Sequence, residues 1–196
     1  MKTLILTAAS VAAAFGLTAA NASTVLTDTQ FFSVTTGQDF TFEFLNPDAN
    51  AGGTGTLVLD LKGDYIPISL NLPGFEFVTL TFDGVMGAAV IENGSVTSNT
   101  IVGLTLDNIT EDTAFNDDEQ FQATFIMSEA LLNMALSGGV LRAVLDNSSG
   151  VNLVDGNDFN SFSLTYNASQ VPVPGALPLM AAGLGAIATR RRKSKA

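Results

Sequence analysis

Short runs of alternating apolar and polar residues recur along the middle of this chain and predict an all-β fold. The clearest run is residues 39–44, where Phe40, Phe42 and Phe44 share one parity and polar residues occupy the other. Because successive side chains of a strand point to opposite faces of a sheet, this pattern is typical of a half-buried strand. Turn-forming Gly, Asn, Asp and Ser separate the runs, as in a β-sandwich or barrel.

Further strands are predicted at residues 57–62, 68–72, 75–82, 88–91, 101–106, 121–127, 140–145 and 162–166. The alternation slips within residues 75–82, which predicts a bulge or a strand buried on both faces. One helix is predicted at residues 129–136, with Ser128 as its N-cap and Gly138-Gly139 as its stop. We therefore expect a single antiparallel β-sandwich, jelly-roll-like, with one short helix.

The first 22 residues have the pattern of a secretory signal peptide. Lys2 supplies a positive start, residues 4–20 are mostly apolar, and Ala20 and Ala22 form the small-x-small pattern that signal peptidases accept. A permanent membrane helix is the alternative, but it needs roughly 20 strongly apolar residues. We expect export, with cleavage after Ala22.

The last 26 residues, 171–196, differ in composition from the domain expected at residues 23–170. They begin with an extended, proline-containing segment made of Val171, Pro172, Val173, Pro174 and Gly175. Residues 176–189 are small and apolar, and a helix of that length spans about 21 Å against a hydrocarbon core of about 30 Å.

A basic cluster, Arg190, Arg191, Arg192 and Lys193, follows that apolar run and is expected to stay on the cytoplasmic side of the inner membrane. So short a span suits a transient stop before processing better than a lasting anchor. A plain tail anchor is the alternative.

This order of proline motif, apolar run and basic cluster resembles a PEP-CTERM-type sorting domain, closest to its VPLPA variant. The likeness covers the C-terminal 26 residues only, and Val173 and Gly175 depart from the usual Leu and Ala. The resemblance implies a Gram-negative bacterium, handling by an exosortase-like membrane enzyme, and a mature protein released to or held at the cell surface, often with exopolysaccharide production.

Removing both ends leaves a strongly acidic domain. Residues 23–170 contain all 19 carboxylates and only two basic residues, Lys62 and Arg142, so their formal charge is −17. Such a surface repels nucleic acid and anionic lipid, because non-specific attraction to phosphates requires Lys and Arg. We expect no nucleic-acid partner.

The residue types present exclude most catalytic sites. The chain has no His and no Cys, which rules out Ser-His-Asp triads, Cys-His pairs and zinc-histidine centres. A two-carboxylate glycoside hydrolase stays open, although the chain has no Trp and only two Tyr to line a sugar cleft. We expect a protein that is not an enzyme.

Two acidic clusters could hold calcium, which takes six to eight oxygen ligands from flexible loops. The candidate ligands are Asp112, Asp117, Asp118, Asp155 and Asp158. Neither cluster matches an EF-hand loop, and solvated acidic loops are the alternative. No other cofactor is expected.

The sequence thus predicts an exported, exosortase-processed surface or matrix protein associated with exopolysaccharide. A carbohydrate-binding jelly-roll module, perhaps dependent on calcium, is the second hypothesis.

Overall fold

The computed structural model describes residues 22–34, 36–65, 76–92, 95–112, 119–151 and 156–169. The strands in these ranges are β1 (Ala22–Phe31), β2 (Asp39–Leu45), β3 (Gly55–Gly63), β4 (Phe77–Phe82), β5 (Ala89–Glu92), β6 (Ser95–Asn99), β7 (Leu104–Asp112), β8 (Glu119–Met127), β9 (Val140–Asn147) and β10 (Phe159–Ala168). One helix, α1 (Glu129–Leu136), lies between β8 and β9.

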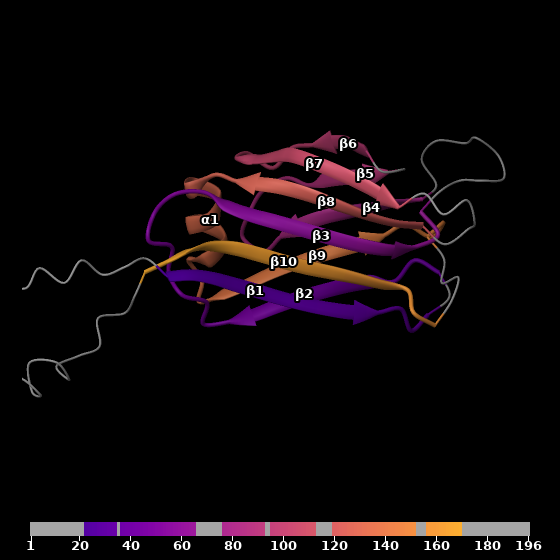
Figure 1. The fold of residues 1–196 in the computed structure, drawn as a ribbon, viewed down its shortest axis with the longest axis horizontal. Coiled ribbons are helices and arrows are strands. Elements are labelled where there is room, and N and C mark those ends of the chain that lie inside the picture. The colour runs from indigo at the N-terminus through magenta and orange to yellow at the C-terminus, as the bar shows by residue number, and fades with distance from the viewer. Residues whose placement is uncertain are drawn as a thin grey trace, which may run out of the picture.

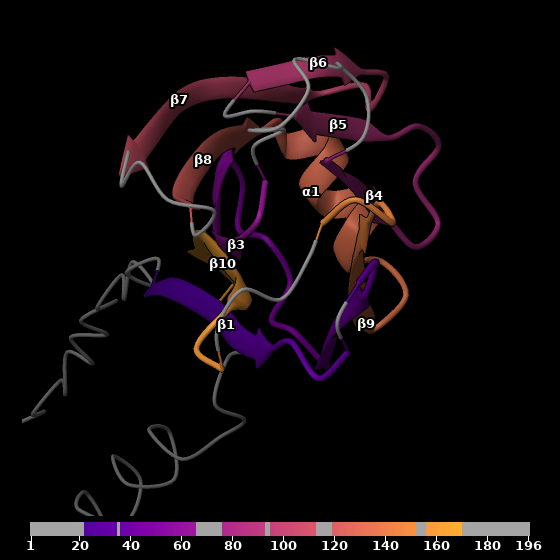
Figure 2. The same ribbon diagram turned by 90° about the vertical axis from the view of Figure 1, so that its right-hand side faces the viewer.

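The strands form two antiparallel sheets of five, packed as a sandwich (Figures 1 and 2). The first sheet has the order β1-β10-β3-β8-β7 and the second β2-β9-β4-β5-β6. Side chains link the sheets along both edges: Gln30 donates to the backbone oxygen of Thr41 at 2.7 Å, and Asn99 to that of Leu104 at 2.8 Å.

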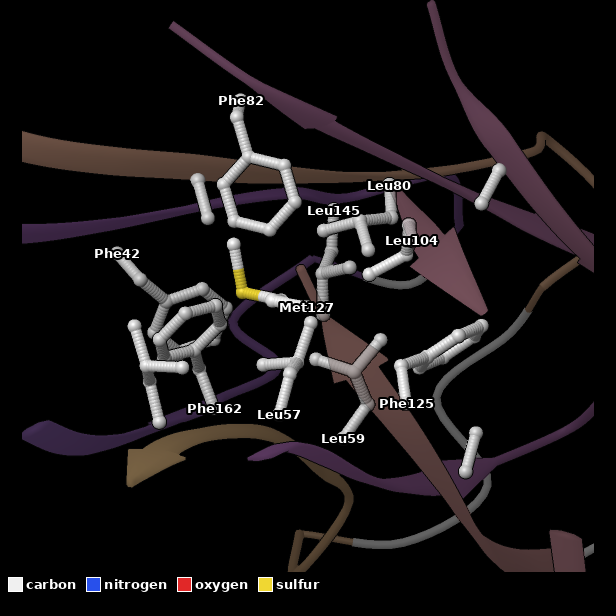
Figure 3. Close-up of a cluster of buried hydrophobic side chains, with 14 of the residues drawn as sticks. Phe42, Leu57, Leu59, Leu80, Phe82, Leu104, Phe125, Met127, Leu145 and Phe162 are labelled. Atoms are coloured by element: carbon white, nitrogen blue, oxygen red, sulfur yellow. The ribbon is translucent and has the colours of Figure 1, made fainter. Parts of the chain in front are cut away.

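The core lies between the sheets and is formed by every second residue of the strands. In β3, Leu57, Leu59 and Leu61 point inward and are fully buried, while the residues between them are half-buried. Phe162 of β10 lies at the centre of an aromatic cluster that joins the two sheets (Figure 3). Its ring centroid is 5.6 Å from that of Phe42.

Helix α1 closes one end of the sandwich, as Figure 1 shows at its left. Ser128 caps the helix by accepting a hydrogen bond from the backbone N–H of Leu131 at 3.3 Å, and one helix face is buried against the core. Because β1 begins and β10 ends at the same end of the sandwich as α1, we call this the helical end, and the opposite one the distal end.

Most of the predicted elements are confirmed. Helix α1 has the predicted bounds and N-cap. Strands are found at the predicted runs 39–44, 57–62, 88–91, 121–127, 140–145 and 162–166, with ends shifted by up to three residues. The predicted run 101–106 is only half right, because β7 starts at Leu104 after a turn. The predicted strand at 68–72 lies outside the described residues.

Of the two alternatives predicted for the 75–82 run, the bulge is wrong for the described part, since β4 pairs with β5 and β9 without a shift in register. Register shifts occur instead at Val90/Ile91 and at Leu106/Asn108. Along β4, half-buried positions alternate with buried ones, so neither face of the strand is fully exposed. Two strands were not predicted. The inward positions of β1 include Asp28 and Gln30, which hides the alternation, and β6 is a largely exposed edge strand.

Candidate functional site

The outward face of the first sheet carries four rows of residues in register across its five strands. The row at the distal end contains Asp112, Lys62 and Phe31, and the three remaining rows are mostly polar and uncharged. From β7 to β1, these three rows are Thr110, Gln122, Asp60, Ser161 and Thr29; Asn108, Thr124, Val58, Ser163 and Thr27; and Thr105, Ile126, Thr56, Thr165 and Val25. Eleven of these fifteen residues are Ser, Thr, Asn or Gln, and all fifteen are exposed or half-buried. We call them the hydroxyl–amide face.

This face is nearly free of charge in a domain whose formal charge is −17. Asp60 is the one ionisable residue among the fifteen, and its carboxylate accepts a hydrogen bond from Gln120 at 2.9 Å. Thr29 donates to the hydroxyl of Ser161 at 2.9 Å, so neighbouring strands also connect through side chains. Hydroxyls and carboxamides donate and accept alike, which suits a neutral ligand rich in hydroxyl groups.

An aromatic pair borders the face at the distal end. Phe31 and Phe159 are register partners on β1 and β10, and their ring centroids lie 6.1 Å apart in an edge-on arrangement. Phe31 keeps 58% of its surface exposed. An exposed ring beside polar side chains offers a ligand both an apolar surface and hydrogen bonds.

Of the calcium candidates, Asp158 is the one whose side chain the structure describes. Its carboxylate is fully buried and lies 3.4 Å from the ammonium of Lys62, so it has a cationic partner within the protein. Asp112 is the last residue of β7, and Asp117, Asp118 and Asp155 lie outside the described residues. Within the described ranges, no three carboxylates gather as a metal site would require.

A buried polar cluster lies between the sheets near Asp158. Tyr65 donates to the carboxamide oxygen of Asn160 at 2.6 Å and contacts that of Asn147 at 3.3 Å. Asn147 donates in turn to the backbone oxygen of Gln38 at 2.9 Å. Burial raises the pKa of Tyr65 far above its usual value, so the phenol stays protonated and acts as a donor.

The outward face of the second sheet differs by carrying a carboxylate pair. Asp39 of β2 and Asp146 of β9 are direct register partners, so their carboxyl groups can share a proton when one of them is protonated. Partial burial, then the hydrogen bond and the charge of Asp39, raise the pKa of Asp146 above its usual value. A raised pKa means that the folded state holds this proton more tightly than the unfolded state does. Stability from this pair is therefore present at low pH and is lost as the pH rises through the raised pKa.

Replacing Asp146 with asparagine should stabilise the protein at pH 7, because it removes a like-charge repulsion between directly opposed residues. We expect a gain in unfolding free energy of about 0.2–1 kcal/mol, toward the lower value because both side chains are exposed to solvent. The gain should vanish near pH 3, below the raised pKa of Asp146, because the Asp146 carboxyl is then neutral and repels no charge. Urea unfolding at the two pH values measures it.

Asp107→Asn is the matched control, since it removes the same charge from an exposed residue at the β7 bulge with no carboxylate in register opposite. An equal gain in this variant, or an Asp146→Asn gain that persists at pH 3, would contradict the assigned repulsion.

Sequence reasoning missed the hydroxyl–amide face. The signal was available in part, because Thr27 and Thr29 in one segment and Ser161, Ser163 and Thr165 in another each repeat with period two. Without the strand order, nothing placed these two segments side by side. The sorting motif at residues 171–175, the basic cluster and residues 1–21 of the expected signal peptide lie outside the described residues, and Ala22 is the first residue of β1.

Comparison with known proteins found no matching family model, no matching curated protein and no matching solved structure. Among the described residues, no helix is both long and apolar enough to cross a membrane.

Proposed function

We propose that this chain is an exported, exosortase-processed surface or matrix protein that binds neutral exopolysaccharide through its hydroxyl–amide face and catalyses no reaction. Export and processing rest on the small-x-small site at Ala22 and on the order of proline motif, apolar run and basic cluster in residues 171–196. The proposed source is a Gram-negative bacterium, in which the tail holds the protein in the inner membrane until it is cut.

The near absence of charge on the hydroxyl–amide face is the observation that carries the binding proposal. Nineteen carboxylates are distributed over residues 23–170, yet the three rows contain only Asp60. A surface that served solubility alone would carry charges on this broad face as it does elsewhere. Hydroxyl and carboxamide groups can instead replace the water around sugar hydroxyls, and the ring of Phe31 offers an apolar contact at the border.

We further infer that the sandwich is a jelly roll. If the edge strands β6 and β7 are set aside, the chain crosses from one sheet to the other after every strand except β4, which is followed by β5 in the same sheet. The resulting orders β1-β10-β3-β8 and β2-β9-β4-β5 support the two interleaved Greek keys of that fold. The broad faces of such a sandwich are continuous, so an extended ligand can contact several strands at once.

The glycosidase alternative gains no support from the carboxylate pair on the second sheet. Glycosidases place two carboxyl groups roughly 5–9.5 Å apart on either side of the scissile bond. Asp39 and Asp146 are instead register partners on adjacent strands of an open sheet face, so they lie next to each other rather than on either side of a substrate cleft.

Affinity electrophoresis tests the binding proposal with exopolysaccharide from the source bacterium, dextran as a neutral glucan and alginate as an anionic one, each with and without calcium. We expect retardation by the exopolysaccharide and none by alginate, because the domain is acidic. The double variant Thr124→Leu/Ser163→Leu should weaken binding by about tenfold, since two hydrogen bonds worth about 0.5–1.5 kcal/mol each are lost.

The control is Thr79→Leu/Thr81→Leu, which likewise replaces two hydroxyl side chains with leucine, at outward positions of β4 in the second sheet. It should bind as the unaltered protein does. Failure of the unaltered protein to bind any of the three glycans would refute the glycan proposal. Equal loss in the control would refute the assignment to the first sheet.

A further inference from the structure

Exposed apolar side chains gather at the helical end of the sandwich. Met86 is 90% exposed, Val102 88% and Met134 52%. Together with Gly84, Val85 and Leu131, these residues line an open hollow of about 250 Å³. We call the six residues the helical-end patch. Contiguous apolar surface of this kind marks an interaction site, because exposing it to water is unfavourable.

The two most exposed side chains of the patch are held outward by stiff turns. Gly87 has φ +106°, and a Cβ there would lie 2.6 Å from the backbone oxygen of Thr100. Two hydrogen bonds join Ala88 and Thr100. The backbone N–H of Thr100 donates to the backbone oxygen of Ala88 at 2.9 Å, and the backbone N–H of Ala88 donates to the hydroxyl of Thr100 at 2.9 Å. The turns that carry Met86 and Val102 are therefore tied together, so their tips are preorganised and project from the sandwich.

The chain also leaves the sandwich at this end. The backbone N–H of Ser169 donates to the backbone oxygen of Ala49 at 2.6 Å, so the chain is fixed to the domain as far as Ser169. The apolar run begins at Ala176, seven residues further on. Seven residues span at most about 25 Å when fully extended. Any surface that takes up the apolar run therefore lies within about 25 Å of the helical end.

We propose that the helical-end patch rests on a zwitterionic lipid surface while the tail is inserted, and thereby holds residues 171–175 at the membrane. This inference rests on the proposed membrane insertion of the tail. The short tether gives the patch a high effective concentration at the bilayer, so weak apolar contacts suffice. The lipid must be zwitterionic, because Asp83 and Glu129 are exposed beside the patch and would be repelled by anionic headgroups.

Single-cysteine labelling tests this orientation cleanly, because the chain has no cysteine of its own. The chain from Ser23 to Ala196 is reconstituted in phosphatidylcholine vesicles that contain a nitroxide-labelled phospholipid. An environment-sensitive fluorophore is attached in turn to Met86→Cys, Val102→Cys and Val34→Cys. Val34 is the matched control, since it is 48% exposed and follows β1 at the distal end.

Labels at positions 86 and 102 should be quenched about twofold or more relative to position 34, because apolar tips enter about 5–10 Å into the headgroup region. Co-flotation with vesicles but equal quenching at all three positions overturns the orientation and leaves the proposed anchoring intact. A blue-shifted but unquenched label at 86 or 102 also overturns it, since the patch is then covered by the tail or by a second copy. Failure of the chain to co-float overturns both proposals.

Discussion

Replacing Phe162 with alanine is expected to lower the free energy of unfolding by about 3–5 kcal/mol, the largest effect of any substitution considered. The Phe162 ring is fully buried and lies against Phe42 and Phe44 at 5.6 Å and Phe82 at 6.5 Å, all of the second sheet. Its removal leaves a cavity where the two sheets meet, and the surrounding rings cannot close it without disturbing both layers. Urea unfolding followed by circular dichroism measures the loss.

Phe31→Ala provides the control, because it deletes the same ring from the same sheet at an exposed position. It should cost well under half as much, since most of the ring already contacts water. Similar losses for the two variants would contradict the placement of Phe162 between the sheets.

Tyr65→Phe is expected to cost about 1–3 kcal/mol, because it removes one hydroxyl from a buried hydrogen-bonded cluster without changing its shape. The Asn160 oxygen that accepts from Tyr65 at 2.6 Å is fully buried. It loses its donor where water has no access, so the desolvation of the amide is no longer compensated. The same urea titration measures the effect.

Tyr166→Phe makes the identical chemical change at the helical end. Tyr166 donates to the backbone oxygen of Asp48 at 2.7 Å, but Asp48 is exposed and water can replace the lost donor. This variant should cost about 1 kcal/mol or less. A Tyr166→Phe loss equal to or larger than that of Tyr65→Phe would show that the buried cluster is not the costlier one to break.

The sequence predicted elements wherever residues adjacent in the chain carry the information. Phe40, Phe42 and Phe44 alternate with polar residues, and Ser128 stands directly before the apolar face of α1. These signals are local, because burial on one face imposes a period and a cap needs one side chain at one place. Strand β1 escaped prediction for the same reason, since polar Asp28 and Gln30 occupy inward positions where apolar residues would have marked the period.

The candidate site could not be predicted, because it depends on pairs of residues far apart in sequence. Thr29 and Ser161 are 132 positions apart, and Asp60 and Gln120 are 60. The hydroxyl–amide face needs the strand order β1-β10-β3-β8-β7, in which the last strand of the domain, β10, lies between β1 and β3. Strand order depends on how whole sheets pack together, and the sequence of one strand does not indicate which strands lie beside it.

The strand order shows where on the domain the charged residues lie, which the net charge alone does not. Sequence alone gave −17 for residues 23–170 and predicted repulsion of nucleic acid. The fold adds that Asp60 is the one carboxylate in the three rows of the first sheet and that two others, Asp39 and Asp146, are register partners on the second. The two broad faces of the sandwich therefore differ in chemistry, which is why matched substitutions on them can separate binding from general surface effects.

Export and processing, the central claim, are tested most directly by the intact mass of the protein recovered from cells and from medium of the source organism. We predict that the protein in the medium begins at Ser23 and ends within residues 171–175, with any longer species confined to the cell fraction. Retention of residues 190–196 in all recovered material would contradict processing of the tail.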